Sequence, residues 1–136
     1  MGLTYLDIPK LIQQLPNGVH NCTIKDVYVV KKQDGEYLSI NGDICVVVVF
    51  SCGDMEHEVG FKLGIVKDYT KYLKLLSIIG VDIQRFTVYK DKSVGKKVAV
   101  FVKKIYTGIN EFHYETTNFK PVKDKGTYTF QSVEYL

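Results

Sequence analysis

The sequence has no tryptophan, only one arginine among its 18 basic residues, and only three cysteines. Arginine is the residue that best reads base edges in a duplex groove, so its near absence argues against sequence-specific duplex recognition. The longest unbroken apolar runs, residues 44–50 and 98–102, are too short to cross a bilayer, and no membrane association is expected. No basic-then-apolar leader opens the chain, which predicts a cytoplasmic protein.

The cysteines are odd in number and form no CxxC pair, which predicts reduced thiols rather than a disulfide framework. A zinc site could be imagined at Cys45, Cys52 and His57, but their spacing matches no zinc-ligand pattern. Three acidic residues could in principle hold Mg²⁺ for phosphodiester hydrolysis: Asp43, Glu56 and Glu58. The lysine that such nuclease sites usually place two residues after the second acid is absent. We therefore expect no metal, no cofactor and no enzymatic activity, and His57 is interpreted as a solvated or half-buried strand residue.

What the sequence does contain is enough apolar material for one folded domain. It has 136 residues, of which 46% are hydrophobic and 24% charged. The net charge of +3 says little by itself, but residues 1–60 carry a net charge of −4 and residues 61–136 a net charge of +7. This distribution permits a polyanionic partner without establishing one.

The first predicted element is a short helix over residues 5–15. Asp7 can cap it, Pro9 is tolerated in its first turn, and an apolar stripe follows at Leu11, Ile12 and Leu15. The turn residues 16–18 end it.

Three strands then form a predicted meander. Along residues 19–30 the apolar parity switches between Ile24 and Val27, which predicts a bulge near residues 25–26 and a long, bent first strand. A hairpin turn at 33–36 leads to a second strand over 38–50, and a third strand follows a turn at 51–54. Val47 and Val49 face outward in this pattern, so a cover from the N-terminal helix or from a second subunit is expected.

The apolar period becomes helical over residues 66–79 and returns to strand over residues 97–106 and 112–119. The order is therefore β-β-β-α-β-β, in an all-β domain with one or two helices. This is the element order of the five-stranded OB-fold barrel, with a sandwich as the alternative. We expect one OB-fold domain over residues 1–119, with the short N-terminal helix, and a C-terminal extension over 120–136.

Such a barrel holds single-stranded nucleic acid across its second and third strands and the loops beside them. Binding requires cations along the phosphates and flat rings on which bases stack. The candidate nucleic-acid-binding residues are Tyr28, Lys31, Lys32, Tyr37, Lys62, Lys103, Lys104, Tyr106, Phe112 and Tyr114. The competing interpretation is that the lysines are solubilising surface and the tyrosines pack at the edge of the core.

Five segments in matching order, 17–27, 35–40, 75–82, 93–100 and 114–119, carry a resemblance to a known family. The chain resembles the small OB-fold single-stranded DNA-binding proteins of bacteriophages and mobile elements. The resemblance implies sequence-tolerant binding of single-stranded DNA, or RNA, during replication or recombination in a bacterial cell or phage-infected host. It also implies a homodimer and partners among replication or recombination proteins.

The tail departs from this family. Better-known bacterial relatives end in a disordered acidic stretch, whereas this tail is lysine-rich and ends at residues 133–136 with Val-Glu-Tyr-Leu. We therefore expect the tail to add a strand or to reach a second subunit. The alternative function is an OB-fold protein–protein interaction module that binds no nucleic acid.

Overall fold

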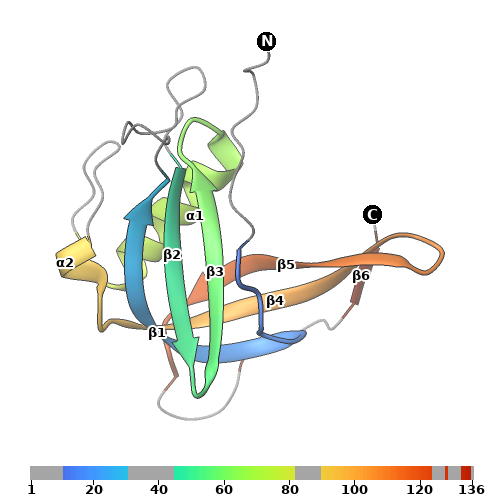
Figure 1. Cartoon of the computed structure of the whole chain (residues 1–136), viewed down its shortest axis with the longest axis horizontal. Helices are drawn as coiled ribbons and strands as arrows, with labels where there is room; N and C mark the ends of the chain where they lie inside the picture. Colours follow the sequence, from blue (N-terminus) through green and yellow to red (C-terminus); the bar gives the residue numbers. More distant parts are fainter. Residues whose placement is uncertain (1–10, 31–44, 82–89, 124–127, 129–132, 136) are drawn as a thin grey trace.

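The computed structural model describes residues 11–30, 45–81, 90–123, 128 and 133–135. Its strands join in one sheet in which β3, β2, β1, β4 and β5 are antiparallel neighbours in that order. The elements, shown in Figure 1, are β1 (Gly18–Val29), β2 (Cys45–Cys52), β3 (Met55–Lys62), α1 (Val66–Ile78), α2 (Lys90–Ser93), β4 (Lys97–Gly108), β5 (Glu111–Lys120) and β6 (Val133–Tyr135). The prediction of a mostly β fold with a meander and a helix after the third strand is confirmed. Neither α1 nor α2 is long and apolar enough to cross a membrane.

β1 is the strand that both halves of the sheet share. Its first half, residues 18–23, pairs with β4, and its second half, residues 23–29, pairs with β2. The register with β2 shifts between Ile24 and Asp26, so the predicted bulge is confirmed. A bulge bends its strand and increases the local twist. As a result β1 curves, and β2 and β3 cross the direction of β4 and β5 in Figure 1.

The core fills the concave side of this bent sheet. β2 and β4 alternate side chains into it, and α1 covers it with one apolar face. Its buried members from these three elements are Val46, Val48, Phe50, Val98, Val100, Val102, Tyr72, Leu75 and Leu76. Phe119 of β5 packs against two of the rings at its centre, with centroids 5.6 Å from Phe50 and 6.0 Å from Phe61. β5 is therefore held to β2 and β3 by aromatic contacts.

The sheet is open, so the predicted closed barrel is not observed. Its two ends are β3 and β5, and these strands do not pair within the described part of the chain. Residues 12–14 occupy the free edge of β3: the Glu58 N–H donates to the Ile12 carbonyl at 2.6 Å, and the Gln14 N–H donates to the Glu56 carbonyl at 3.2 Å. α1 contacts both β3 and β5. Residues 12–14 therefore use the backbone groups at the β3 edge that a β3–β5 ladder would need.

The predicted N-terminal helix is wrong for residues 11–15, and residues 5–10 lie outside the described part of the chain. Residues 11–15 are extended, with Gln13 bridged to His57 of β3. Leu15 enters the core, whereas Leu11 joins a second apolar cluster with Tyr28 and the buried Val47 on the opposite side of the sheet. A short isolated helix is marginal in water, so the hydrogen bonds offered by an open strand edge outweigh it. The outward-facing Val47 and Val49 of β2 are both buried, and Leu11 packs against the cluster that contains Val47.

The C-terminal extension adds a strand, one of the two outcomes expected for it. β6 pairs in parallel with residues 104–106 of β4. β1 pairs with the same edge of β4 up to Val102, and the Asn17 side-chain oxygen accepts the Lys104 N–H between them at 3.0 Å. β6 therefore continues the edge of β4 that β1 leaves uncovered.

Candidate nucleic-acid interface

β4 and β5 continue past the core as a ribbon, seen at the right of Figure 1, and β6 pairs with residues 104–106 of β4 along its edge. β4 runs to Gly108, so the predicted loop over 107–110 is shorter than expected and consists of Ile109 and Asn110. Asn110 adopts a positive φ of 61°, which asparagine tolerates better than most residues. Ile109 is 93% exposed at the tip.

One face of this ribbon carries three aromatic rings and a lysine. Tyr106 lies directly opposite Phe112, and Lys104 lies opposite Tyr114, so all four side chains share a face. Along β4 these residues continue the alternation that sends Val102 into the core. The face of β4 that lines the core therefore continues along the ribbon as the face that bears these rings.

The four residues Lys104, Tyr106, Phe112 and Tyr114, here called the ring cluster, touch one another. The Phe112 ring centroid lies 5.8 Å from that of Tyr106 and 5.8 Å from that of Tyr114. The Lys104 ammonium lies 4.0 Å from the Phe112 centroid and 5.1 Å from that of Tyr106. Phe112 and Tyr114 remain 47% and 42% exposed. Exposed rings beside a cation are the chemistry that stacks bases and attracts phosphate.

The acidic groups of β5 lie on the other face of the ribbon. Glu115 is opposite Lys103, and His113 is opposite Ile105. Adjacent residues of a strand point to opposite faces, so Lys103 is separated from Lys104 and lies beside a carboxylate. Of the two predicted lysines on β4, only Lys104 joins the ring cluster.

The other described candidates lie away from the ring cluster. The Tyr28 hydroxyl donates to the Glu58 carboxylate at 2.9 Å, and burial together with that carboxylate raises the pKa of Tyr28 to about 12. Lys62 ends β3, where its backbone N–H donates to the Asp68 carboxylate at 2.9 Å. Lys31, Lys32 and Tyr37 lie outside the described residues.

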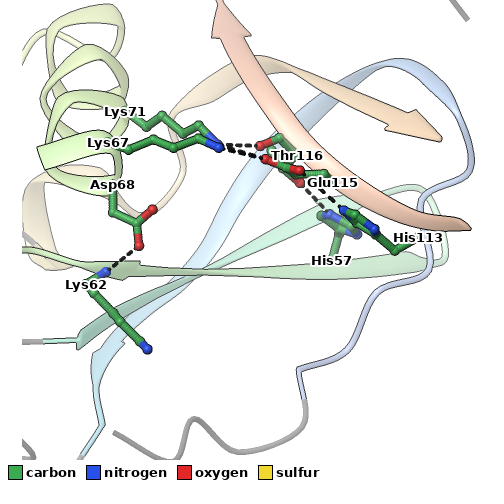
Figure 2. A network of polar contacts seen from close by, with 8 residues as sticks. All are labelled: His57, Lys62, Lys67, Asp68, Lys71, His113, Glu115 and Thr116. Atoms are coloured by element: carbon green, nitrogen blue, oxygen red, sulfur yellow. Dashed lines mark hydrogen bonds and ion pairs between the residues drawn. The ribbon is translucent and has the colours of Figure 1, made fainter. Parts of the chain in front are cut away.

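A polar network joins α1 to the base of the ribbon (Figure 2). Glu115 pairs with Lys67 at 3.4 Å and with Lys71 at 3.7 Å, and His113 approaches it at 3.4 Å. Partial burial favours a higher pKa for Glu115, but the His113 hydrogen bond and the two lysine charges outweigh it, and the pKa is lowered. Lys71 also donates to the Thr116 carbonyl at 3.1 Å. These contacts fix where the ribbon leaves the core.

His57 links the two ends of the sheet. Its ring is only 2% exposed, so the interpretation as a solvated or half-buried residue is wrong: Phe50 lies opposite it, on the core side of β2. Its Nε2 lies 2.9 Å from the Thr116 hydroxyl of β5, whereas its Nδ1 is buried without a partner in the described structure. Burial, with a smaller contribution from His20, lowers the pKa of His57 to about 4.

This burial predicts a loss of stability in mild acid. The unfolded chain takes up a proton on His57 near pH 6.5, whereas the folded protein does so only near pH 4. Unfolding therefore binds a proton in this window, and His57 makes stability fall by about 3 kcal/mol as the pH falls from 6.5 to 4. Urea denaturation across this range should show the loss in the wild-type protein.

The matched variant is His57→Gln, whose amide can still hydrogen-bond to the Thr116 hydroxyl but does not titrate. Its free energy of unfolding should change less than that of the wild type between pH 6.5 and 4. If the free energy of unfolding changed equally with pH in the two proteins, His57 would not be the cause of the acid sensitivity.

A second group of rings and lysines was not among the sequence predictions. Lys120 lies 5.5 Å from the Phe101 ring centroid and 5.1 Å from that of Tyr128, and Lys123 lies 4.2 Å from the latter. The only sequence signal is the spacing of basic and aromatic residues in the extension. Phe101 has the opposite strand parity to Lys104, so this group lies on the other face of β4 from the ring cluster.

No protein-family model matches the sequence, and no curated protein matches it either. Within the described residues, no three histidine, cysteine, aspartate or glutamate side chains lie close enough together to hold a metal ion.

Proposed function

We propose that this protein binds single-stranded DNA without strong sequence preference and protects it during replication or recombination. The observation that supports this best is the ring cluster, in which exposed Phe112 and Tyr114 adjoin Tyr106 and the Lys104 ammonium on one face of the ribbon. Every base has a flat face, so stacking on rings tolerates any sequence. Lysine supplies a point charge for phosphate rather than the paired donors that read bases.

Among the described residues, none of the three rings belongs to either of the buried apolar clusters. Tyr106, Phe112 and Tyr114 lie within four residues of the turn at Ile109 and Asn110, and Phe112 and Tyr114 keep nearly half their surface in water. Single exposed apolar residues are common on proteins, but a contiguous group usually marks a binding surface. The acidic Glu115 points to the other face, which leaves the ring cluster favourable for a polyanion.

We also propose that the fold is an opened variant of the OB architecture. A bulged first strand shared by both halves of the sheet, and a helix between the third and fourth strands, support this. The proposal extends to a cytoplasmic, non-enzymatic protein that acts as a homodimer with replication or recombination partners. RNA is the other single-stranded ligand that this chemistry would accept.

Fluorescence titration with labelled oligo-dT at several salt concentrations tests the proposal. Binding should weaken with salt. For each tenfold increase in salt concentration, the base-ten logarithm of the affinity should fall by about 0.7 per phosphate contact. Lys104→Ala should reduce this slope by about 0.7, because one phosphate contact is lost. Lys25→Ala is the control, since Lys25 pairs with Glu56 at the surface. Absence of binding, or binding that salt does not affect, would refute the proposal.

The protein–protein interaction module is the second candidate, and Ile109 is the observation that favours it. An isoleucine 93% exposed at the ribbon tip has no role in stacking bases. This candidate predicts no binding of oligo-dT and a defined complex by light scattering. Ile109→Ser should then disrupt the complex, whereas it should leave oligo-dT binding intact if the first proposal holds.

A further inference from the structure

Two of the three cysteines face each other across β1 and β2. The register pairs Ile24 with Phe50 and Thr23 with Ser51, and the next step places Cys22 opposite Cys52. Both side chains point to the core side of the sheet, where Cys22 belongs to the core and Cys52 packs against it. Both are free thiols.

The hydrogen-bonding pattern shows which kind of pair they form. The Ile24 N–H donates to the Lys96 carbonyl at 2.9 Å, and the Ile24 carbonyl accepts the Gly95 N–H at 2.8 Å. The backbone groups of Ile24 therefore point away from β2, and those of Cys22, two residues earlier, do the same. Cys22 and Cys52 are thus placed as a non-hydrogen-bonded pair, the closer of the two antiparallel types, in which Cα atoms are typically about 4.5 Å apart.

That separation falls within the range of about 4.4–6.8 Å found between the Cα atoms of disulfide-bonded cysteines. Burial first, and then the nearby Cys52, raise the pKa of the Cys22 thiol, which donates to the His20 carbonyl at 3.5 Å. We propose that Cys22 and Cys52 are an oxidation site at which hydrogen peroxide closes a disulfide between β1 and the end of β2.

The third thiol is excluded by its place in the strand. Cys45 begins β2 and is fully buried in the second apolar cluster, on the opposite side of the sheet. It lies seven positions before Cys52 along the same strand, which is roughly 23 Å at about 3.3 Å per residue. No disulfide spans that distance, so Cys45 serves as an internal control.

Cys52 is the thiol that reacts first, because it is half-buried while the other two are buried. Its thiolate attacks one peroxide oxygen: an S–O bond forms, the O–O bond breaks, and the released hydroxide takes up a proton to become water. The Cys22 thiolate then attacks the resulting sulfenic acid; an S–S bond forms, the S–O bond breaks, and the leaving hydroxide takes a proton from solvent. Two thiols are oxidised to one disulfide, and one peroxide is reduced to two waters.

The second step should be slow at neutral pH, because Cys22 must first give up its proton to water and attack as a thiolate; the leaving hydroxide is then protonated by solvent. Burial raises the pKa of Cys22 to about 12, so little of it is thiolate at pH 7. Closure should accelerate about tenfold for each pH unit between 7 and 9, because the thiolate fraction rises in that proportion.

The test is to expose the folded protein to hydrogen peroxide, alkylate the remaining thiols after unfolding, and map the peptides by mass spectrometry. A bridge between Cys22 and Cys52, with Cys45 alkylated, is the expected result. The Cys45→Ala variant should form the same bridge, and Cys52→Ser should form none. The bridged protein should have a higher thermal midpoint than the reduced protein, because a cross-link restricts the unfolded chain, and thiol reductant should remove both the bridge and this rise.

Three results would overturn the inference. One is a bridge that includes Cys45, and another is sulfinic acid at Cys52 with no bridge. The third is a Cys22–Cys52 bridge that forms equally well when the chain is oxidised in urea, because the strand register would then have no part in it. The experiment involves no nucleic acid, so its result is independent of the proposed function.

Discussion

Replacing Phe119 with alanine should lower the free energy of unfolding by about 3–5 kcal/mol. Phe119 is fully buried in β5, and its ring packs against Phe50 of β2 and Phe61 of β3. Within the described residues β5 forms a ladder with β4 alone, so these ring contacts and the His57–Thr116 contact hold it against β2 and β3. Alanine would leave a cavity between β5 and these two strands. Urea denaturation followed by circular dichroism measures the loss.

Phe112→Ala on the same strand is the matched control. The same side chain is removed, but Phe112 is 47% exposed on the ribbon, so the expected loss is below about 1 kcal/mol. The contrast tests the placement of β5 rather than the size of the ring. Equal losses from the two substitutions would mean that Phe119 does not occupy the core as described.

The features that the sequence predicted correctly are those set by local alternation. The change of parity between Ile24 and Val27 can keep one face inward only if a residue is inserted, and the structure has its register shift between Ile24 and Asp26. Helical spacing over residues 66–79 likewise gave α1, which ends one residue earlier at Ile78. Such elements can be predicted because the spacing of apolar residues gives both the type of element and the face that it buries.

The failures concern partners that are distant in sequence. Leu11, Ile12 and Leu15 fit a helical stripe, but the free edge of β3, more than 40 residues away, gives this segment a different way to satisfy its backbone. His57 sits between two glutamates and gave no signal of burial, since its contact with Thr116 depends on how far the open sheet bends. Local patterns cannot show either contact.

The candidate site was predicted in part for the same reason. Lys104, Tyr106, Phe112 and Tyr114 come together because they share one strand pair whose register follows from a short turn. Strand alternation places Lys103 on the other face. Tyr28 differs because its partner Glu58 is 30 residues away, on a strand that is not adjacent in the sheet. The alternation of side chains along β1 predicted only that Tyr28 faces away from Val27 and Val29, which made it a candidate for stacking.

Replacing Phe112 and Tyr114 together with alanine should reduce the affinity for oligo-dT by at least roughly 30-fold. Each stacked ring contributes about 1–3 kcal/mol to binding, and about 1.4 kcal/mol corresponds to a factor of ten. The two rings touch, so their separate losses need not sum to that of the double variant. Fluorescence anisotropy at a fixed salt concentration measures the change.

The salt dependence separates stacking from charge. The double variant keeps Lys104, so its affinity should fall while the slope of log affinity against log salt stays that of the wild type; Lys104→Ala should instead change the slope. Tyr114→Phe retains the ring and should bind nearly as tightly as the wild type. Unchanged affinity in the double variant would exclude the ring cluster as the stacking surface. A changed slope would instead show that the rings act by positioning Lys104 over Phe112, where its ammonium lies 4.0 Å from the ring centroid.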